Sequence, residues 1–276
     1  MKILNDIKYD QLNNERVLDL YFNEDSRISS QSPLILYVHG GLWVSRDKSE
    51  YKQLAEYLVE QGFTVAVMNY QLTSKANNVK YPSHNEDLFR CMFFLQSNTL
   101  LNAHYKSGKF IGIGHSCGGH MIGSLVLRWQ EYQQRLGVID TDIEMPLSHF
   151  IGIEGIYDNE LFVSDFPEWR SEIEFVYGKS DPKDWDSPSN KLPLNQHQID
   201  QLHNLNVLLI HSPQDTWVNA NQSSNFKNLL QQQYQIKNVI FDENVKGTHF
   251  DVVLNISVKE NSEASLIRNS ILNFLK

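Results

Sequence analysis

Residues 110–119 read FIGIGHSCGG, and they contain the only Gly-x-Ser-x-Gly motif of the chain, from Gly114 to Gly118. The apolar run FIGI has the composition of a buried strand, and a helical spacing of apolar residues resumes after the second glycine. A serine at the apex of such a strand–turn–helix lies in a strained backbone conformation, which glycines two positions to either side permit. The motif therefore predicts that Ser116 is a nucleophile.

Two other interpretations of this motif are open. Glycine and serine are common residues, so the segment could be a glycine-rich loop with an incidental serine. The thiol of Cys117 could also be the nucleophile. In a strand–turn–helix of this kind, however, the residue after the apex directs its backbone N–H at the substrate and not its side chain. Ser116 is therefore preferred over the thiol.

Short apolar runs alternate with longer amphipathic stretches along the rest of the chain, which is typical of strand–helix units on a mainly parallel sheet. We expect one α/β domain over residues 1–276. The stretch at about 155–206 is rich in aromatic residues, proline, aspartate and serine and breaks this alternation, so it is predicted to be a lid. The expected strands are 16–22, 34–38, 63–68, 110–113, 150–153, 207–210 and 239–241. The expected helices are one capped by Ser49 and ended by Gly62, then 82–94, 121–135, 221–233 and 262–275.

A second glycine motif, HGGLW at residues 39–43, directly follows an expected core strand. A loop in this position supplies a backbone N–H to the oxyanion that forms during acyl transfer, and glycines let the backbone approach the charge. The expected oxyanion hole consists of backbone groups of Gly40, Gly41, Leu42 and Cys117.

The acid and the base of a serine nucleophile are expected later in the chain, in the order serine, acid, histidine. Asp215 follows the expected strand 207–210, and His249 follows the strand that ends near Phe241. Both would lie at the carboxyl edge of a parallel sheet, where Ser116 also lies. Asp251 is too close to His249 along the chain to orient it easily. The predicted catalytic residues are therefore Ser116, Asp215 and His249.

Together these motifs resemble the kynurenine formamidases of the α/β-hydrolase superfamily, and most closely the fungal arylformamidases. The HGGLW motif is the most telling element, because carboxylesterases of the hormone-sensitive-lipase group usually carry a third glycine where Leu42 stands. The run EGIYD at residues 154–158 also resembles a segment of the fungal enzymes. The likeness extends from Leu34 to the C-terminus and is vague through the expected lid. Gly119 and Cys117 depart from the family pattern without affecting the predicted triad.

This resemblance implies an α/β-hydrolase fold and hydrolysis of N-formyl-L-kynurenine to L-kynurenine and formate, a step of tryptophan catabolism and of NAD synthesis. It implies no cofactor, a small aromatic amino acid as the ligand, and leaves a homodimer open. Trp43, Tyr157 and Trp217 are the expected walls of the substrate pocket. A small-acyl carboxylesterase on the same scaffold and a non-catalytic ligand-binding protein are the alternatives.

Charge and composition set further expectations. The formal net charge of −9 offers no basic surface for nucleic acid or for an anionic membrane. The N-terminal sequence has no apolar core of a signal peptide, and the two cysteines cannot form a disulfide framework, so a cytoplasmic protein is expected. The sequence has neither a His-Glu-x-x-His pair nor a Cys/His cluster, and no metal site is predicted.

Overall fold

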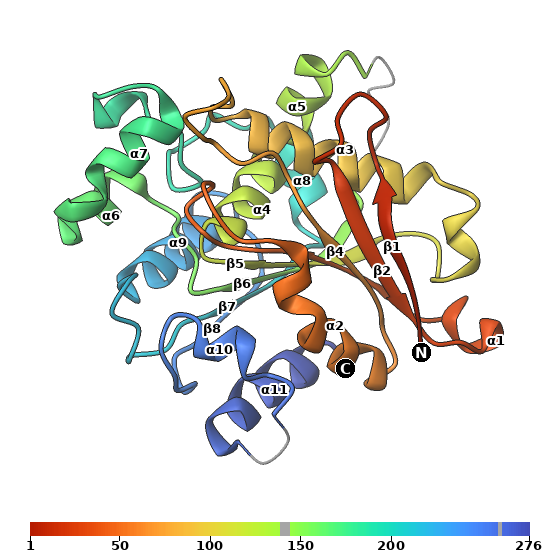
Figure 1. Cartoon of the computed structure of the whole chain (residues 1–276). Coiled ribbons are helices and arrows are strands. Elements are labelled where there is room, and N and C mark those ends of the chain that lie inside the picture. Colours follow the sequence, from red (N-terminus) through yellow and green to blue (C-terminus); the bar gives the residue numbers. More distant parts are fainter. Residues whose placement is uncertain (139–143, 259–260) are drawn as a thin grey trace.

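One eight-stranded sheet forms the centre of the molecule (Figure 1). The computed structural model describes residues 1–138, 144–258 and 261–276. The strand order is β1-β2-β4-β3-β5-β6-β7-β8, and every neighbouring pair from β4 to β8 is parallel. The remaining pairs of this sheet, β1·β2 and β2·β4 at one edge, are antiparallel. The expected mainly parallel sheet is therefore confirmed. The strands are β1 Lys2–Lys8, β2 Val17–Phe22, β3 Leu34–Val38, β4 Thr64–Met68, β5 Phe110–His115, β6 Leu147–Ile153, β7 Asn206–Ile210 and β8 Asn238–Asp242.

Helices cover both faces of this sheet (Figure 1). Buried side chains of α3, α4 and α9 belong to the core on one face, and those of α2, α10 and α11 to the core on the other. No helix among the described residues is both long and apolar enough to cross a membrane. The α-helices are α1 Ser26–Ser29, α2 Lys52–Glu60, α3 Ser83–Ser97, α4 Cys117–Leu127, α5 Trp129–Arg135, α6 Asn159–Asp165, α7 Arg170–Tyr177, α8 Gln196–Leu202, α9 Asn221–Gln232, α10 Asp251–Leu254 and α11 Ser262–Phe274.

The central strands read as continuous apolar runs because they are buried on both faces. In β3, Leu36 and Val38 point into one core, and Ile35 and Tyr37 point into the other. Side chains of a strand alternate between the two faces of a sheet, so both sets must be apolar where helices cover both faces. This accounts for the recognisable run LILYV at residues 34–38.

Several elements differ from the sequence-based expectation. Strand β1 was not expected, because this edge strand is mostly solvent-exposed and has no apolar run. The turn before α2 is capped by Asp47 in a capping box with Glu50, and not by Ser49. The single helix expected over 121–135 is two helices, α4 and α5, separated at Arg128.

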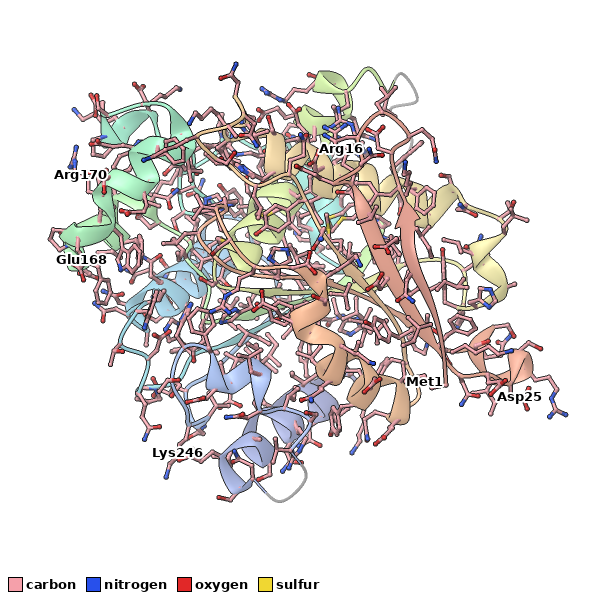
Figure 2. The ribbon with its side chains drawn as sticks, viewed as in Figure 1. Met1, Arg16, Asp25, Glu168, Arg170 and Lys246 are labelled. Carbon is pink, nitrogen blue, oxygen red and sulfur yellow. The ribbon has the colours of Figure 1, made fainter. Side chains whose placement is uncertain are left out.

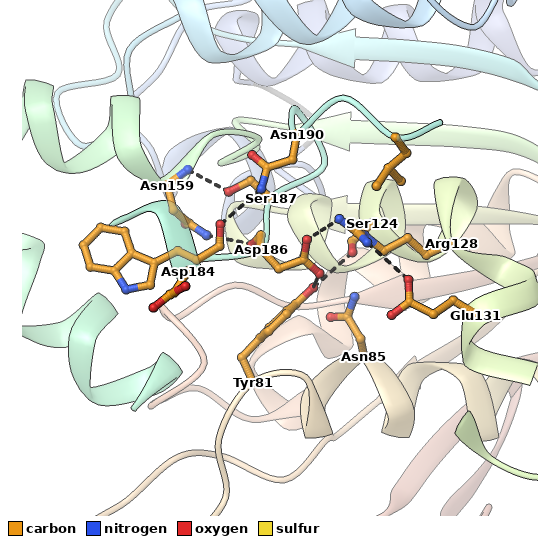
Figure 3. A network of polar contacts seen from close by, with 12 residues as sticks. Tyr81, Asn85, Ser124, Arg128, Glu131, Asn159, Asp184, Asp186, Ser187 and Asn190 are labelled. Atoms are coloured by element: carbon orange, nitrogen blue, oxygen red, sulfur yellow. Dashed lines mark hydrogen bonds and ion pairs between the residues drawn. The ribbon is translucent and has the colours of Figure 1, made fainter. Parts of the chain in front are cut away.

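The segment between β6 and β7 carries α6, α7 and α8 and is fastened to the sheet layer by partly buried polar contacts (Figure 3). The carboxylate of Asp186 pairs with the guanidinium of Arg128, at the end of α4. The Tyr81 hydroxyl donates to Asp186 Oδ2 at 3.2 Å and lies 3.1 Å from Ser124 Oγ. A side chain from the segment is thus held between α4 and the residues that precede α3.

A second buried ion pair holds the start of β2 against α3. Arg16, which is labelled in Figure 2, donates from Nε to Asp87 Oδ1 at 2.7 Å and also donates to Asp10 and Gln71. The Asp87 side chain is fully buried, and burial raises its pKa to about 6 although Arg16 and Arg90 oppose the shift. An ionised Asp87 therefore depends on its cationic neighbours.

Replacing Arg16 tests this dependence. Arg16→Met should lower the free energy of unfolding by about 3 kcal/mol at pH 8, because it leaves a buried carboxylate short of a partner. The loss should be smaller at pH 5, where the folded state can keep Asp87 protonated. Arg27→Met is the matched control, since Arg27 pairs with Asp25 at 2.6 Å on the exposed surface (Figure 2). Urea unfolding at both pH values measures the effect, and equal behaviour of the two variants would contradict it.

Candidate active site

Ser116 lies at the apex of a sharp turn between β5 and α4, with φ 55° and ψ −123°. Few non-glycine residues adopt this conformation, and such strain is concentrated at functional sites. The turn is closed by contact between backbones. A Cβ on Gly114 would lie 2.4 Å from the carbonyl oxygen of Gly118, and a Cβ on Gly118 would lie 2.2 Å from that of Val38. Neither glycine of the motif can therefore be replaced by a larger residue without a steric clash.

Asp215 and His249 are hydrogen-bonded to each other, with Nδ1 of the imidazole 2.7 Å from Oδ2 of the carboxylate. The other carboxylate oxygen accepts the backbone N–H groups of Trp217 and Val218 at 2.7 and 3.1 Å. Asp215 can only accept while it is ionised, so Nδ1 carries the proton and Nε2 is left for the pocket.

The charges of this pair are strongly perturbed. Burial opposes the ionisation of Asp215, but the His211 ring, 3.4 Å away, and the hydrogen bond from His249 hold its pKa well below the ordinary range. Burial also opposes a charged His249, yet the carboxylate of Asp215, and that of Glu154 when it is ionised, raise its pKa. The site therefore favours an imidazolium once His249 has accepted a proton.

His249 is held by its backbone as well as by its ring. The Nε2 of His115, in the Gly-x-Ser-x-Gly motif, lies 2.7 Å from the carbonyl oxygen of His249. Gly247, in the same loop, donates its N–H to Gln214 Oε1 at 2.9 Å, which links the His249 loop to the Asp215 loop. Asp251 accepts from Thr248 and does not contact the imidazole pair.

A pocket of about 210 Å³ opens beside these groups. Ser116 and His249 both line it, and so do Gly41 and Leu42 of the HGGLW loop. Leu42 has φ 49°, a left-handed conformation that is uncommon for a leucine. The backbone of the loop is therefore strained at a residue that lines the pocket.

The other two expected oxyanion-hole residues lie directly against the serine. A Cβ on Gly40 would come within 2.9 Å of Ser116 Cβ, and Cys117 is the first residue of α4, where a backbone N–H has no partner within the helix. The Cys117 thiol is fully buried, and burial raises its pKa to about 11. A thiol in this state is a poor nucleophile, which disfavours the alternative that Cys117 reacts.

Two of the three aromatic residues expected to wall the pocket do not reach it. Trp43 is fully buried and packs edge-on against His120, with ring centroids 5.0 Å apart. Tyr157 is also fully buried and stacks on Phe226 at 4.3 Å. Both side chains pack in the interior, and neither belongs to the lining of this pocket.

Trp217 does line the pocket, and it is 41% exposed. It stacks on Trp169 at 5.2 Å and lies nearly parallel to the His249 ring at 6.0 Å. Trp169 and Glu172, from the segment between β6 and β7, complete one side of the pocket, and Arg46 lies on its lining too. Sequence reasoning missed these last three residues, because no motif or periodicity marks them.

Glu154 is the other residue that sequence reasoning left without a role. It directly follows β6, with φ 52°, and its carboxyl group is fully buried beside Asp215 and His249. Among the described residues, these three form the one group of His, Cys, Asp and Glu side chains close enough to share a metal ion, with ligand atoms within 4.8 Å of one another. The Nδ1 of His249 is already committed to Asp215, so hydrogen bonding accounts for the cluster.

Several proteins of known structure with a similar fold are named esterases. Esterase B from Lactobacillus rhamnosis superposes with a TM-score of 0.73 over 99% of this chain and 84% of its own, at 17% sequence identity. The α/β-hydrolase fold expected from the sequence is thereby confirmed.

Relatives in sequence are named kynurenine formamidase. The protein of that name from Drosophila melanogaster is 22% identical over 92% of this chain and 77% of its own length. One from the yeast Meyerozyma guilliermondii is 24% identical over 79% of this chain and 78% of its own length. The BD-FAE family model matches residues 18–230, well over half of the chain. With this match and this fold, the chain belongs to the BD-FAE family, a family of α/β-hydrolases.

Proposed function

We propose that this hydrolase is an arylformamidase that cleaves N-formyl-L-kynurenine to L-kynurenine and formate through Ser116, His249 and Asp215. The observation that carries the proposal is the composition of one pocket. There the strained serine and the free edge of the imidazole lie beside two stacked indoles and two side chains of opposite charge, Arg46 and Glu172. The similarity to proteins named kynurenine formamidase supports the same substrate.

In the first half of the proposed reaction, Ser116 Oγ attacks the formyl carbon. His249 Nε2 takes the hydroxyl proton, and Asp215 fixes the imidazole tautomer and balances the imidazolium charge. The oxyanion lies against the N–H of Cys117 and that of Gly41 or Leu42. Close backbone contacts at Gly40 and Gly118 support rigid donors, which would need little reorganisation as the charge develops.

In the second half, the tetrahedral intermediate collapses and the C–N bond breaks. His249 returns its proton to the departing aniline nitrogen, which leaves a formyl ester on Ser116. Water then attacks this ester with His249 again as the base, and formate departs while Ser116 regains its proton. The leaving aniline nitrogen shares its lone pair with the ring, so it departs more readily than an alkyl amine. No cofactor takes part in this sequence.

The charged residues of the pocket suit the amino-acid end of the substrate. The guanidinium of Arg46 lies 4.3 Å above the Phe250 ring and lines the pocket, where it can donate hydrogen bonds to an α-carboxylate, while Glu172 can pair with an α-ammonium group. The indoles of Trp169 and Trp217 offer flat faces to the aromatic ring. A volume of about 210 Å³ suits a compact substrate better than a long-chain ester.

Substitution of the three catalytic residues is the primary test. Ser116→Ala and His249→Ala should each lower kcat for N-formyl-L-kynurenine by at least about 10⁴-fold, and Asp215→Asn by about 10⁴-fold. Asp251→Asn is the matched control for Asp215, since Asp251 lies closer to His249 in sequence but does not contact its ring. The assay follows the absorbance of kynurenine. Turnover that survives in Ser116→Ala would defeat the mechanism, and ester hydrolysis without deformylation would favour the carboxylesterase alternative.

A second prediction concerns substrate recognition. Arg46→Met and Glu172→Gln should each raise KM for N-formyl-L-kynurenine by about tenfold, the loss of one partly exposed charge-assisted contact. Neither should change KM for N-formylaniline, which lacks the amino-acid group. Glu50→Gln is the control for Arg46, because it removes the 2.7 Å ion pair of Arg46 but leaves its guanidinium in the pocket. Equal effects on both substrates would show that these residues only shape the pocket.

A further inference from the structure

Glu154 is a fully buried acid that the proposed mechanism does not use. Its backbone N–H donates to the carbonyl of Ile210 at 2.8 Å, and its Oε1 accepts the N–H of Ser212 at 3.0 Å. Its Oε2 is buried without a hydrogen-bond partner and lies 3.4 Å from Nδ1 of His249. The left-handed backbone of Glu154 shows that the chain accepts strain to hold this side chain in place.

The lack of a hydrogen-bond partner at Glu154 Oε2 indicates that this oxygen carries a proton. The single proton on His249 Nδ1 is donated to Asp215 at 2.7 Å, so it is not available for a hydrogen bond to Glu154 Oε2. An ionised oxygen buried without a donor, next to a second carboxylate, is costly. A protonated Oε2 is a donor instead, and Asp215 is the acceptor beside it. Burial and the charge of Asp215 both raise the pKa of Glu154 above its ordinary range.

The other groups around Glu154 do not supply a competing charge. The titratable side chains that face it are Asp215 and His211, from β7 and the loop after it, and His249, from the loop before α10. His211 Nε2 lies 2.8 Å from the carbonyl oxygen of Val218 and therefore donates there. This leaves Asp215 and His249 as the partners with which Glu154 can exchange charge.

We propose that Glu154 is a positioning residue that holds a proton in place of His249, so that the imidazole is free to accept the proton of Ser116 although two carboxyl groups flank it. One proton can be held by the cluster in two ways. It lies either on Glu154 Oε2 with a neutral His249, or on His249 Nε2 with Glu154 ionised; the two forms interconvert by exchange with water and have the same total charge. The buried, unpartnered oxygen favours the first form, in which Ser116 can react.

This inference rests on the proposed triad but not on the proposed substrate. The experiment therefore measures acylation of Ser116 by p-nitrophenyl acetate as a function of pH, which needs the base His249 and no formamide. Glu154→Gln imitates the protonated acid, because its amide oxygen can accept from Ser212 and its NH₂ can donate to Asp215. Asp251→Asn, which removes an exposed carboxylate close to His249 in sequence, is the matched control.

The acid limb of kcat/KM should stay within about 0.3 pH units of the wild type in Glu154→Gln, because the neutral amide replaces an acid that is already neutral in the reactive form. The rate at neutral pH should stay within about tenfold of the wild type, and the control should keep the wild-type profile. A limb that moves to lower pH by about one unit or more in a folded Glu154→Gln protein would show that Glu154 is ionised in the wild type and raises the pKa of His249. A loss of 100-fold or more at every pH would show that the ionised carboxylate is required. Either result overturns the proposal.

A measurement on the unaltered protein covers the case in which the variant does not fold. Nitrogen NMR of ¹⁵N-histidine-labelled protein, assigned by comparison with His249→Ala, should show His249 at neutral pH as the neutral tautomer with a bare Nε2. An imidazolium signal at that pH would refute the proposal. Acylation that persists in Ser116→Ala would instead remove the triad on which it rests, whereas a failure to deformylate N-formyl-L-kynurenine leaves it intact.

Discussion

The contact between helix α4 and strand β3 is the constraint on which the site depends. At Gly118 the helix backbone lies so close to the carbonyl of Val38 that no side chain fits between them. The contact joins the end of β3 to the start of α4, so the loop after β3 and the serine before α4 share one support. The first N–H groups of α4, which lack partners within the helix, are thereby fixed next to the HGGLW loop. A looser contact would separate the two halves of the expected oxyanion hole.

Parallel strand order explains why several polar groups meet at one imidazole. Strands β5, β6 and β7 are neighbours in the sheet, and their carboxyl ends lead to Ser116, Glu154 and Asp215 in that order. The loop after β8, the next strand, carries His249. Consecutive strands thus deliver one functional side chain each to the same edge. Two acids flank one histidine because β6 and β7 both end beside it. The protonation state of each of the three side chains therefore depends on that of the other two.

The sequence predicts the parts of this molecule that local physics controls. The run LILYV and the motif around Ser116 are recognisable because double-sided burial and close backbone contact leave few residue choices. The pairing of Asp215 with His249 follows from strand order and is present in the structure. Strand β1 was missed because an exposed edge carries little apolar signal. The burial of Trp43 and Tyr157, and the approach of Trp169 to Trp217, depend on packing between distant segments, which periodicity does not report.

The segment between β6 and β7 was expected as a lid, and its fastening bears on how ligands enter and leave. Asp186 pairs with Arg128 and receives a hydrogen bond from Tyr81, so lifting this segment would break a partly buried ion pair and its hydrogen bond. Trp169 and Glu172 belong to the same segment and are held with it. We therefore expect ligands to exchange through a permanently open mouth. Selection among substrates then depends on the fixed shape of the pocket. Such an enzyme needs no contact with a lipid–water interface to become active.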